Sequence, residues 1–193
     1  YGLAAADGVC AGLGAAGRGF ALMETPGVPR SPIVPAAILY DLANGGDKAW
    51  GETPPYRALG LQALKAASDR PVELGRAGAG FGAMAGTDPG GTGSASAMTS
   101  DGYTVGALVC VNSFGSVRIP GSYAFWAHPF EIGDEFGGVR PPPGHRFDAE
   151  GWGRAKINPG ARENTTIAIV ATDSALTRDQ ARRLAVMAQD GLA

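Results

Sequence analysis

The chain has 193 residues, of which 45% are hydrophobic and 18% are charged, and its formal net charge is −2. This composition is that of one globular domain, residues 1–193, that can bury a sizeable core, and it lacks the bias of disordered chains. The small net charge gives no reason to expect a nucleic-acid partner. Because the sequence contains neither an apolar run of about 18 residues nor a signal-peptide pattern, we expect no membrane partner and a cytoplasmic location.

The few cysteines and histidines argue against disulfides and metal sites. Cys10 and Cys110 lie far apart in the sequence, which favours free thiols in a reducing compartment over a disulfide framework. His128 and His145 are the only histidines, and no cysteine cluster accompanies them. We therefore expect neither a structural zinc site nor a cofactor.

Two helices are predicted in the first third of the chain. Residues 3–16 are rich in alanine, contain no proline and lead to Gly17, which is a typical helix stop. Residues 56–67 follow a Pro-Pro pair and place Leu59 and Leu64 on one apolar stripe, as in a surface helix.

A glycine-rich stretch follows these helices. Residues 78–83 fit the loose dinucleotide-binding pattern GxGxxG/A, which binds a pyrophosphate only when a helix begins at once. The next residues include Gly86, Asp88-Pro89 and Gly90-Gly91, which cannot continue as a helix. We reject nucleotide binding and interpret these glycines as points of close backbone approach.

The second half of the chain predicts two strands and a helix. Residues 104–111 form a continuous apolar strand that ends at Asn112, and residues 167–172 form another. A capping box at residues 177–180 begins the last helix. Residues 122–156, rich in aromatics and prolines, predict a long irregular excursion packed by its own rings. This excursion is interpreted either as a tail that frees an active-site mouth or as a plain surface loop or oligomer contact.

The sequence Asn164-Thr165, placed before the apolar strand, suits an enzyme that cuts its own backbone. The Thr165 hydroxyl can attack the Asn164 carbonyl, shift the acyl group from nitrogen to oxygen and release a new α-amine on hydrolysis. An α-amine titrates at about 7.7–8.0 and can serve the same hydroxyl as its base. From these residues alone, Thr165-Thr166 can equally be two β-branched residues that start a strand.

Several segments of the chain together resemble one known family. They are Gly160-Ala161-Arg162-Glu163-Asn164-Thr165-Thr166, residues 169–173 and 176–181, and upstream residues 1–9, 32–42, 75–80, 93–96 and 105–112. The family they resemble is the self-processing L-aminopeptidase/D-alanine esterase-amidase family, which includes β-aminopeptidases and nylon-oligomer (aminohexanoate-oligomer) hydrolases. The resemblance implies an α/β fold of the layered αββα type, as in N-terminal-nucleophile hydrolases. Residues 1–164 would form the upstream part and residues 165–193 the start of the downstream part, with the processing bond between Asn164 and Thr165.

The resemblance also implies roles for individual residues. Thr165 would be the nucleophile, and Asn112 would hold the developing oxyanion, although a lone Asn at a strand end is otherwise a common turn residue. Tyr40 would line the substrate cleft and donate a hydrogen bond through its phenol, or else be an aromatic at the core edge. The partners implied are a small peptide, amide or linear amide oligomer and further copies, as a homo-oligomer of cleaved heterodimers.

One position departs from the family pattern. Nylon-hydrolase-like members carry a Lys where this chain has Gly86-Thr87-Asp88, and Thr87 cannot supply a positive charge. Family members also extend beyond both ends, so we expect this chain to be a fragment. Two rival interpretations stay open: a threonine acyltransferase of the ornithine acetyltransferase type, and a non-catalytic, uncut homologue.

Overall fold

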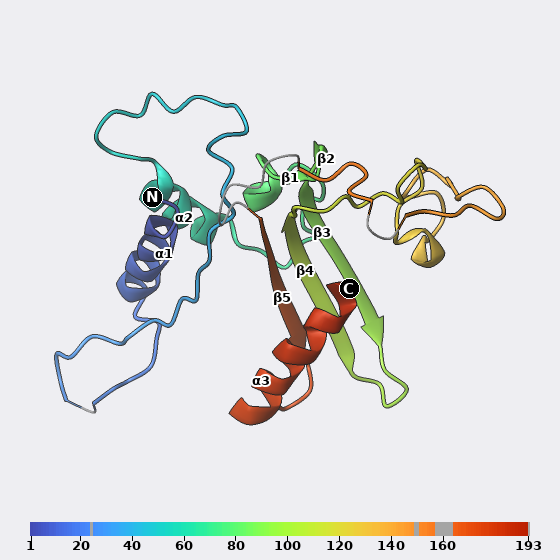
Figure 1. Ribbon diagram of the computed structural model, residues 1–193. Coiled ribbons are helices and arrows are strands. Elements are labelled where there is room, and N and C mark those ends of the chain that lie inside the picture. The colour runs from blue at the N-terminus through green and yellow to red at the C-terminus, as the bar shows by residue number, and fades with distance from the viewer. Residues whose placement is uncertain (24, 149–150, 157–163, 193) are drawn as a thin grey trace. The chain divides into compact units, whose positions relative to one another are not determined.

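The computed structural model describes residues 1–23, 25–148, 151–156 and 164–192 (Figure 1). The chain divides into two compact units. The first unit comprises Tyr1–Ile38 and Gly46–Pro71, and the second comprises Leu39–Gly45 and Val72–Ala193.

The first unit is built on a close pair of helices, α1 (Ala4–Ala15) and α2 (Tyr56–Ala66). They cross at two buried glycines, where a Cβ on Gly8 or on Gly60 would lie 2.0 Å from a backbone oxygen of the other helix. The missing side chains therefore let the two backbones touch. An exposed ion pair also links the two helices, with Arg57 Nε 2.6 Å from Asp7 Oδ2.

The second unit contains a three-stranded antiparallel sheet in the order β3-β4-β5. The strands are β3 (Gly91–Met98), β4 (Thr104–Asn112) and β5 (Thr165–Thr172). A tight turn joins β3 to β4, whereas β5 returns to pair with β4 after a long excursion. A two-strand ribbon of β1 (Met84–Ala85) and β2 (Asp88–Pro89) precedes the sheet, after a short 3-10 turn η1 (Gly78–Gly80).

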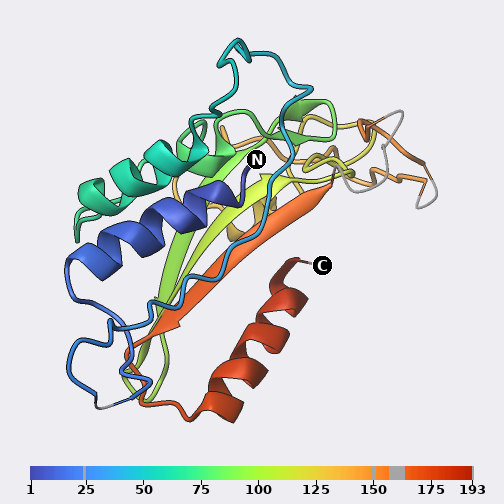
Figure 2. The same cartoon turned by 90° about the vertical axis from the view of Figure 1, so that its left-hand side faces the viewer.

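The last helix lies alongside β5, as Figures 1 and 2 show. Helix α3 (Arg178–Met187) continues into the 3-10 turn η3 (Ala188–Leu192) and begins with the predicted capping box, in which Thr177 and Gln180 bond reciprocally. A cavity of about 490 Å³ lies between this helix and β5. The strand residues that line it are Thr166, Ala168, Val170 and Thr172. Because strand side chains alternate between faces, Thr165 points to the face away from α3.

The segment between β4 and β5 is irregular, as predicted, with only a 3-10 turn η2 (His128–Phe130) in its described part. Its aromatic side chains pack on one another, in the pairs Phe125–Phe136 and Trp126–Phe147. The side chain of Glu131 is enclosed and accepts hydrogen bonds from the backbone N–H groups of Phe136 and Gly138, and it pairs with Arg140. These contacts close residues 131–140 into a self-supporting turn.

The predicted helices and strands are confirmed to within two residues at each end. No helix follows the glycines of residues 78–83; β1 and β2 come next instead. Helix and sheet occur together, so the α/β class is confirmed at that level. The described residues form one three-stranded sheet and a ribbon rather than two stacked sheets, so the αββα sandwich stays a prediction.

Candidate functional site

The register of the sheet brings Asn112 and Thr165 together. Asn112 ends β4, Thr165 begins β5, and the two are direct partners across the antiparallel ladder. Directly opposed residues have their side chains on the same face, with Cβ atoms about 4.5–5.5 Å apart. Two residues far apart in the sequence thus lie side by side at one end of the sheet.

Asn112 is completely buried, and it is the largest side chain with no exposure among the described residues. Its Oδ1 accepts from the Met84 backbone N–H at 3.0 Å, and its Nδ2 donates to the Tyr40 backbone oxygen at 3.0 Å. These partners fix the direction of the amide, because a flipped side chain would oppose N–H to N–H and oxygen to oxygen.

Tyr40 meets the site through its backbone. It lies in the segment Leu39–Gly45, which belongs to the same unit as the sheet. The Asn44 side chain ties this segment to the glycine-rich stretch by donating to the Gly82 oxygen at 2.8 Å. The Tyr40 residue is 36% exposed, and the substrate contact expected of its phenol stays a prediction.

Asn164 precedes Thr165 and carries a buried side-chain oxygen. Its Oδ1 is buried and has no hydrogen-bond partner in the described part of the chain. A buried acceptor left unpaired costs about 1–3 kcal/mol. The rest of the approach to the predicted processing bond, residues 157–163, lies outside the described residues.

Lys156 is a site residue that the sequence analysis missed. Its Nζ lies 3.3 Å from Asn112 Oδ1, on the same acceptor as the Met84 N–H. A positive charge therefore reaches the site even though Thr87 cannot provide one. No sequence signal indicated it, because residues 153–155 form a turn and a bend rather than a strand with a readable side-chain alternation.

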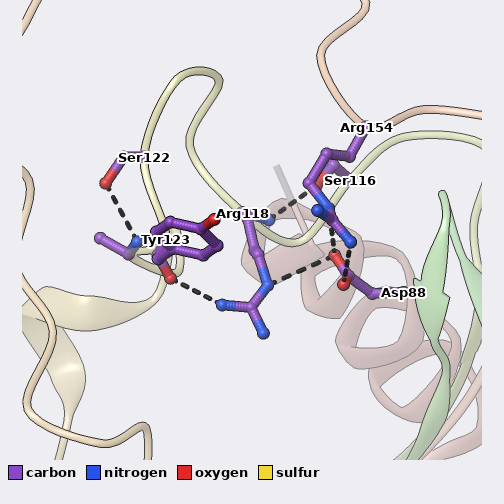
Figure 3. A network of polar contacts seen from close by, with 7 residues as sticks. Asp88, Ser116, Arg118, Ser122, Tyr123 and Arg154 are labelled. Carbon is purple, nitrogen blue, oxygen red and sulfur yellow. Dashed lines mark hydrogen bonds and ion pairs between the residues drawn. The ribbon is translucent and has the colours of Figure 1, made fainter.

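The position that departs from the family pattern forms an ion cluster (Figure 3). Asp88 accepts from Arg154 at both oxygens, with Oδ1 2.8 Å from Nη2 and Oδ2 3.1 Å from Nε. Arg118 approaches the same carboxylate at 3.3 Å and donates to the Tyr123 backbone oxygen at 2.7 Å. Asp88 is thus paired with two arginines rather than presented to a ligand.

An open, largely apolar cavity of about 310 Å³ adjoins the end of β4. Phe114 lies on its wall two residues after Asn112, and Ala155 lies there one residue before Lys156. Phe114 and Trp152 make an edge-to-face contact at 5.1 Å beside it. The other lining residues are Gly115, Ser116, Arg118, Pro120, Trp126 and Gly151.

The described residues contain neither a metal-binding cluster nor a membrane-spanning helix. Within residues 1–23, 25–148, 151–156 and 164–192, no group of three or more His, Cys, Asp or Glu side chains is arranged to hold a metal ion. The same described residues include no helix of sufficient length and apolarity to span a bilayer. Cys10 and Cys110 are both free thiols.

The comparisons with known proteins agree with the resemblance. The model of peptidase family S58, the L-aminopeptidase/D-alanine esterase-amidase family, matches residues 2–193. The protein named uncharacterized aminopeptidase ML1167 of Mycobacterium leprae is 41% identical over 197 residues, covering 100% of this chain and 51% of that protein. The proteins named uncharacterized aminopeptidase Mb1368 of Mycobacterium bovis and Rv1333 of Mycobacterium tuberculosis are each 40% identical over 194 residues, covering 100% of this chain and 53% of theirs. The chain therefore spans about half the length of these curated relatives.

Proposed function

Since the chain belongs to peptidase family S58, we propose that it is an autoprocessed N-terminal-threonine amidohydrolase, with Thr165 as nucleophile and Asn112 as oxyanion donor. The observation that carries this proposal is the direct pairing of Asn112 with Thr165 at one end of the sheet. In this role the two residues must face the same reacting carbonyl, and opposed positions on a ladder meet that requirement.

Self-cleavage would begin when the Thr165 hydroxyl oxygen attacks the Asn164 carbonyl carbon. The Asn164–Thr165 amide bond breaks, an ester to the Thr165 oxygen forms, and the nitrogen leaves as an α-amine. Water then hydrolyses the ester and frees the Asn164 carboxylate. The unpaired Oδ1 of Asn164 supports this step, because cutting the chain would release a buried acceptor that raises the free energy of the uncut form.

Turnover would use the same atoms. The new α-amine takes the proton of the Thr165 hydroxyl, whose oxygen attacks a substrate amide and forms an acyl-enzyme. The Asn112 Nδ2 side of the amide stabilises the oxyanion, a contribution of about 10²–10³ in kcat for a preorganised donor. The substrate amine departs with the proton, and water hydrolyses the acyl ester.

We propose small peptides or amides with a free amino end, or linear amide oligomers, as substrates. The names of the relatives favour aminopeptidase activity. The cavity of about 310 Å³ beside Phe114 is of a size for one apolar or aromatic side chain of such a substrate. The proposal includes the αββα sandwich, the homo-oligomer of cleaved heterodimers and a cytoplasmic enzyme.

Intact-mass measurement on the full-length protein tests the proposal. We expect two chains, of which the downstream one begins at Thr165 by N-terminal sequencing. The Thr165→Ala variant should stay uncut, whereas Thr166→Ala, which changes the next Thr on the opposite strand face, should still be cut. A downstream chain with another first residue, or cleavage of Thr165→Ala, would refute the proposal.

A further inference from the structure

We infer that Lys156 is a positioning residue of the threonine site, which fixes and polarises the Asn112 amide that faces the reacting carbonyl. This inference rests on the proposed function of Thr165 and Asn112, and it assigns the cationic group of the site to a residue outside the segment where family members carry theirs.

Lys156 contacts the oxygen end of the Asn112 amide directly. The Lys156 ammonium lies 3.3 Å from Asn112 Oδ1, inside a region where the amide has no exposure to solvent. A charged donor on the amide oxygen draws electron density from the nitrogen and makes its N–H groups better donors. The nitrogen end of Asn112 is the end that would bind an oxyanion, so the charge on Lys156 would act through Asn112.

Backbone hydrogen bonds anchor the segment around Lys156. The Lys156 N–H donates to the Phe114 oxygen at 3.0 Å, just beyond the end of β4. Two residues earlier, the Arg154 oxygen accepts from the Thr87 N–H at 2.8 Å. Gly86 has a positive φ of 61°, and a Cβ there would lie 2.2 Å from the Arg154 oxygen, so this approach requires glycine.

The Arg154 side chain reinforces the same anchor through its two hydrogen bonds to Asp88. Residues 154–156 are therefore held by the segment that departs from the family pattern, Gly86-Thr87-Asp88. Thr87 donates a backbone hydrogen bond, Gly86 allows the close backbone approach, and Asp88 pairs with the Arg154 side chain. All of these contacts lie upstream of Asn164. Cutting the Asn164–Thr165 bond would leave Lys156 on the upstream chain, in contact with Asn112 for both self-cleavage and turnover.

Substitution of Lys156 tests the inference. We expect Lys156→Met to slow self-cleavage, followed by intact mass, by about tenfold or more, which is less than the 10²–10³ typical of a direct oxyanion donor. For cleaved protein, kcat on an alanyl p-nitroanilide should fall by a similar factor while KM changes little, because the lost interaction is made in the transition state. Lys156→Arg, which keeps the charge, should recover part of the rate. Lys65→Met, at an exposed position of α2, is the matched control and should leave both rates unchanged.

The outcomes separate this inference from the proposed function. Wild-type protein that stays a single chain and hydrolyses no amide would refute the role of Thr165 itself. Wild-type protein that is cut, together with a Lys156→Met variant cut within about twofold as fast, would overturn the role of Lys156 alone. A Lys156→Arg variant as slow as Lys156→Met would also overturn it, since the argument depends on charge. A Tm for Lys156→Met close to that of the wild type, with slowed cleavage, would support a role in the site rather than in folding.

Discussion

Asn112 can be tested by one substitution that separates its structural role from its chemical one. In Asn112→Ala, the Met84 N–H and the Tyr40 oxygen would both lose their partners inside the protein. At about 1–3 kcal/mol for each buried group, the loss is about 2–6 kcal/mol, out of a typical domain stability of about 5–15 kcal/mol. An inactive alanine variant would therefore prove little, because it would also be less well folded.

Asn112→Asp is the more informative change. A carboxylate keeps an acceptor for the Met84 N–H and for Lys156, and the nearby ammonium favours its charged form. It replaces the donor by an oxygen that faces the Tyr40 oxygen, so that oxygen is unpaired and repelled, at a cost of at least about 1–3 kcal/mol. We expect a folded variant whose self-cleavage and kcat fall by about 10²–10³. Thermal unfolding and intact mass would be followed together. A folded Asn112→Asp variant that cuts itself within about threefold of the wild-type rate would show that no oxyanion donor resides at this position.

Three further predictions concern other parts of the chain. Gly60→Ala should lower the free energy of unfolding by about 1–3 kcal/mol in thermal or urea denaturation, because its Cβ would clash with the α1 backbone, whereas Gly14→Ala, with open space, should be neutral or stabilising. The bond from Arg140, then that from the Gly138 N–H, lowers the pKa of Glu131 below its ordinary 4.5. The contribution of ionised Glu131 to folding stability is therefore complete above pH 4.5 and is lost as the pH falls through the lowered pKa. Acid should for this reason reduce the Tm of the wild type more than that of Glu131→Gln. Trp152→Ala should lower kcat/KM for aromatic substrates about tenfold relative to alanyl ones, while Phe130→Ala, exposed and outside the cavity, should not; equal effects on both substrates would remove the cavity from substrate binding.

The local elements of this fold could be predicted from sequence because each carries its own signal. Thr177 and Gln180 form the capping box that predicts the start of α3. The apolar run of β4 predicts a strand without any knowledge of the strands that pair with it. Strand β3 was not predicted because its Gly, Ser and Ala residues have low strand propensity. It is extended because it pairs with β4 along its whole length.

Some residues of the candidate site could be predicted from the sequence and one could not. Thr165, Asn112 and Tyr40 were predicted through a resemblance, and the structure brings Asn112 to Thr165 by register and to Tyr40 by a backbone contact. Lys156 could not be predicted, because its contact depends on where an irregular excursion returns to the sheet. Neither hydrophobic periodicity nor capping rules carry information on such a return.

The pairing of β4 with β5 has a consequence for how this chain tolerates insertions and deletions. Eight consecutive pairs, from Val105 with Thr172 to Asn112 with Thr165, set the two site residues opposite each other. A single residue inserted within β4 would turn every later side chain to the other face and separate Asn112 from Thr165, without altering either residue. The excursion between the strands carries no such constraint, since its length does not enter the register. Changes in the length of that excursion away from residues 154–156 and the Asn164–Thr165 bond are therefore compatible with the ladder, whereas changes in spacing within β4 or β5 are not.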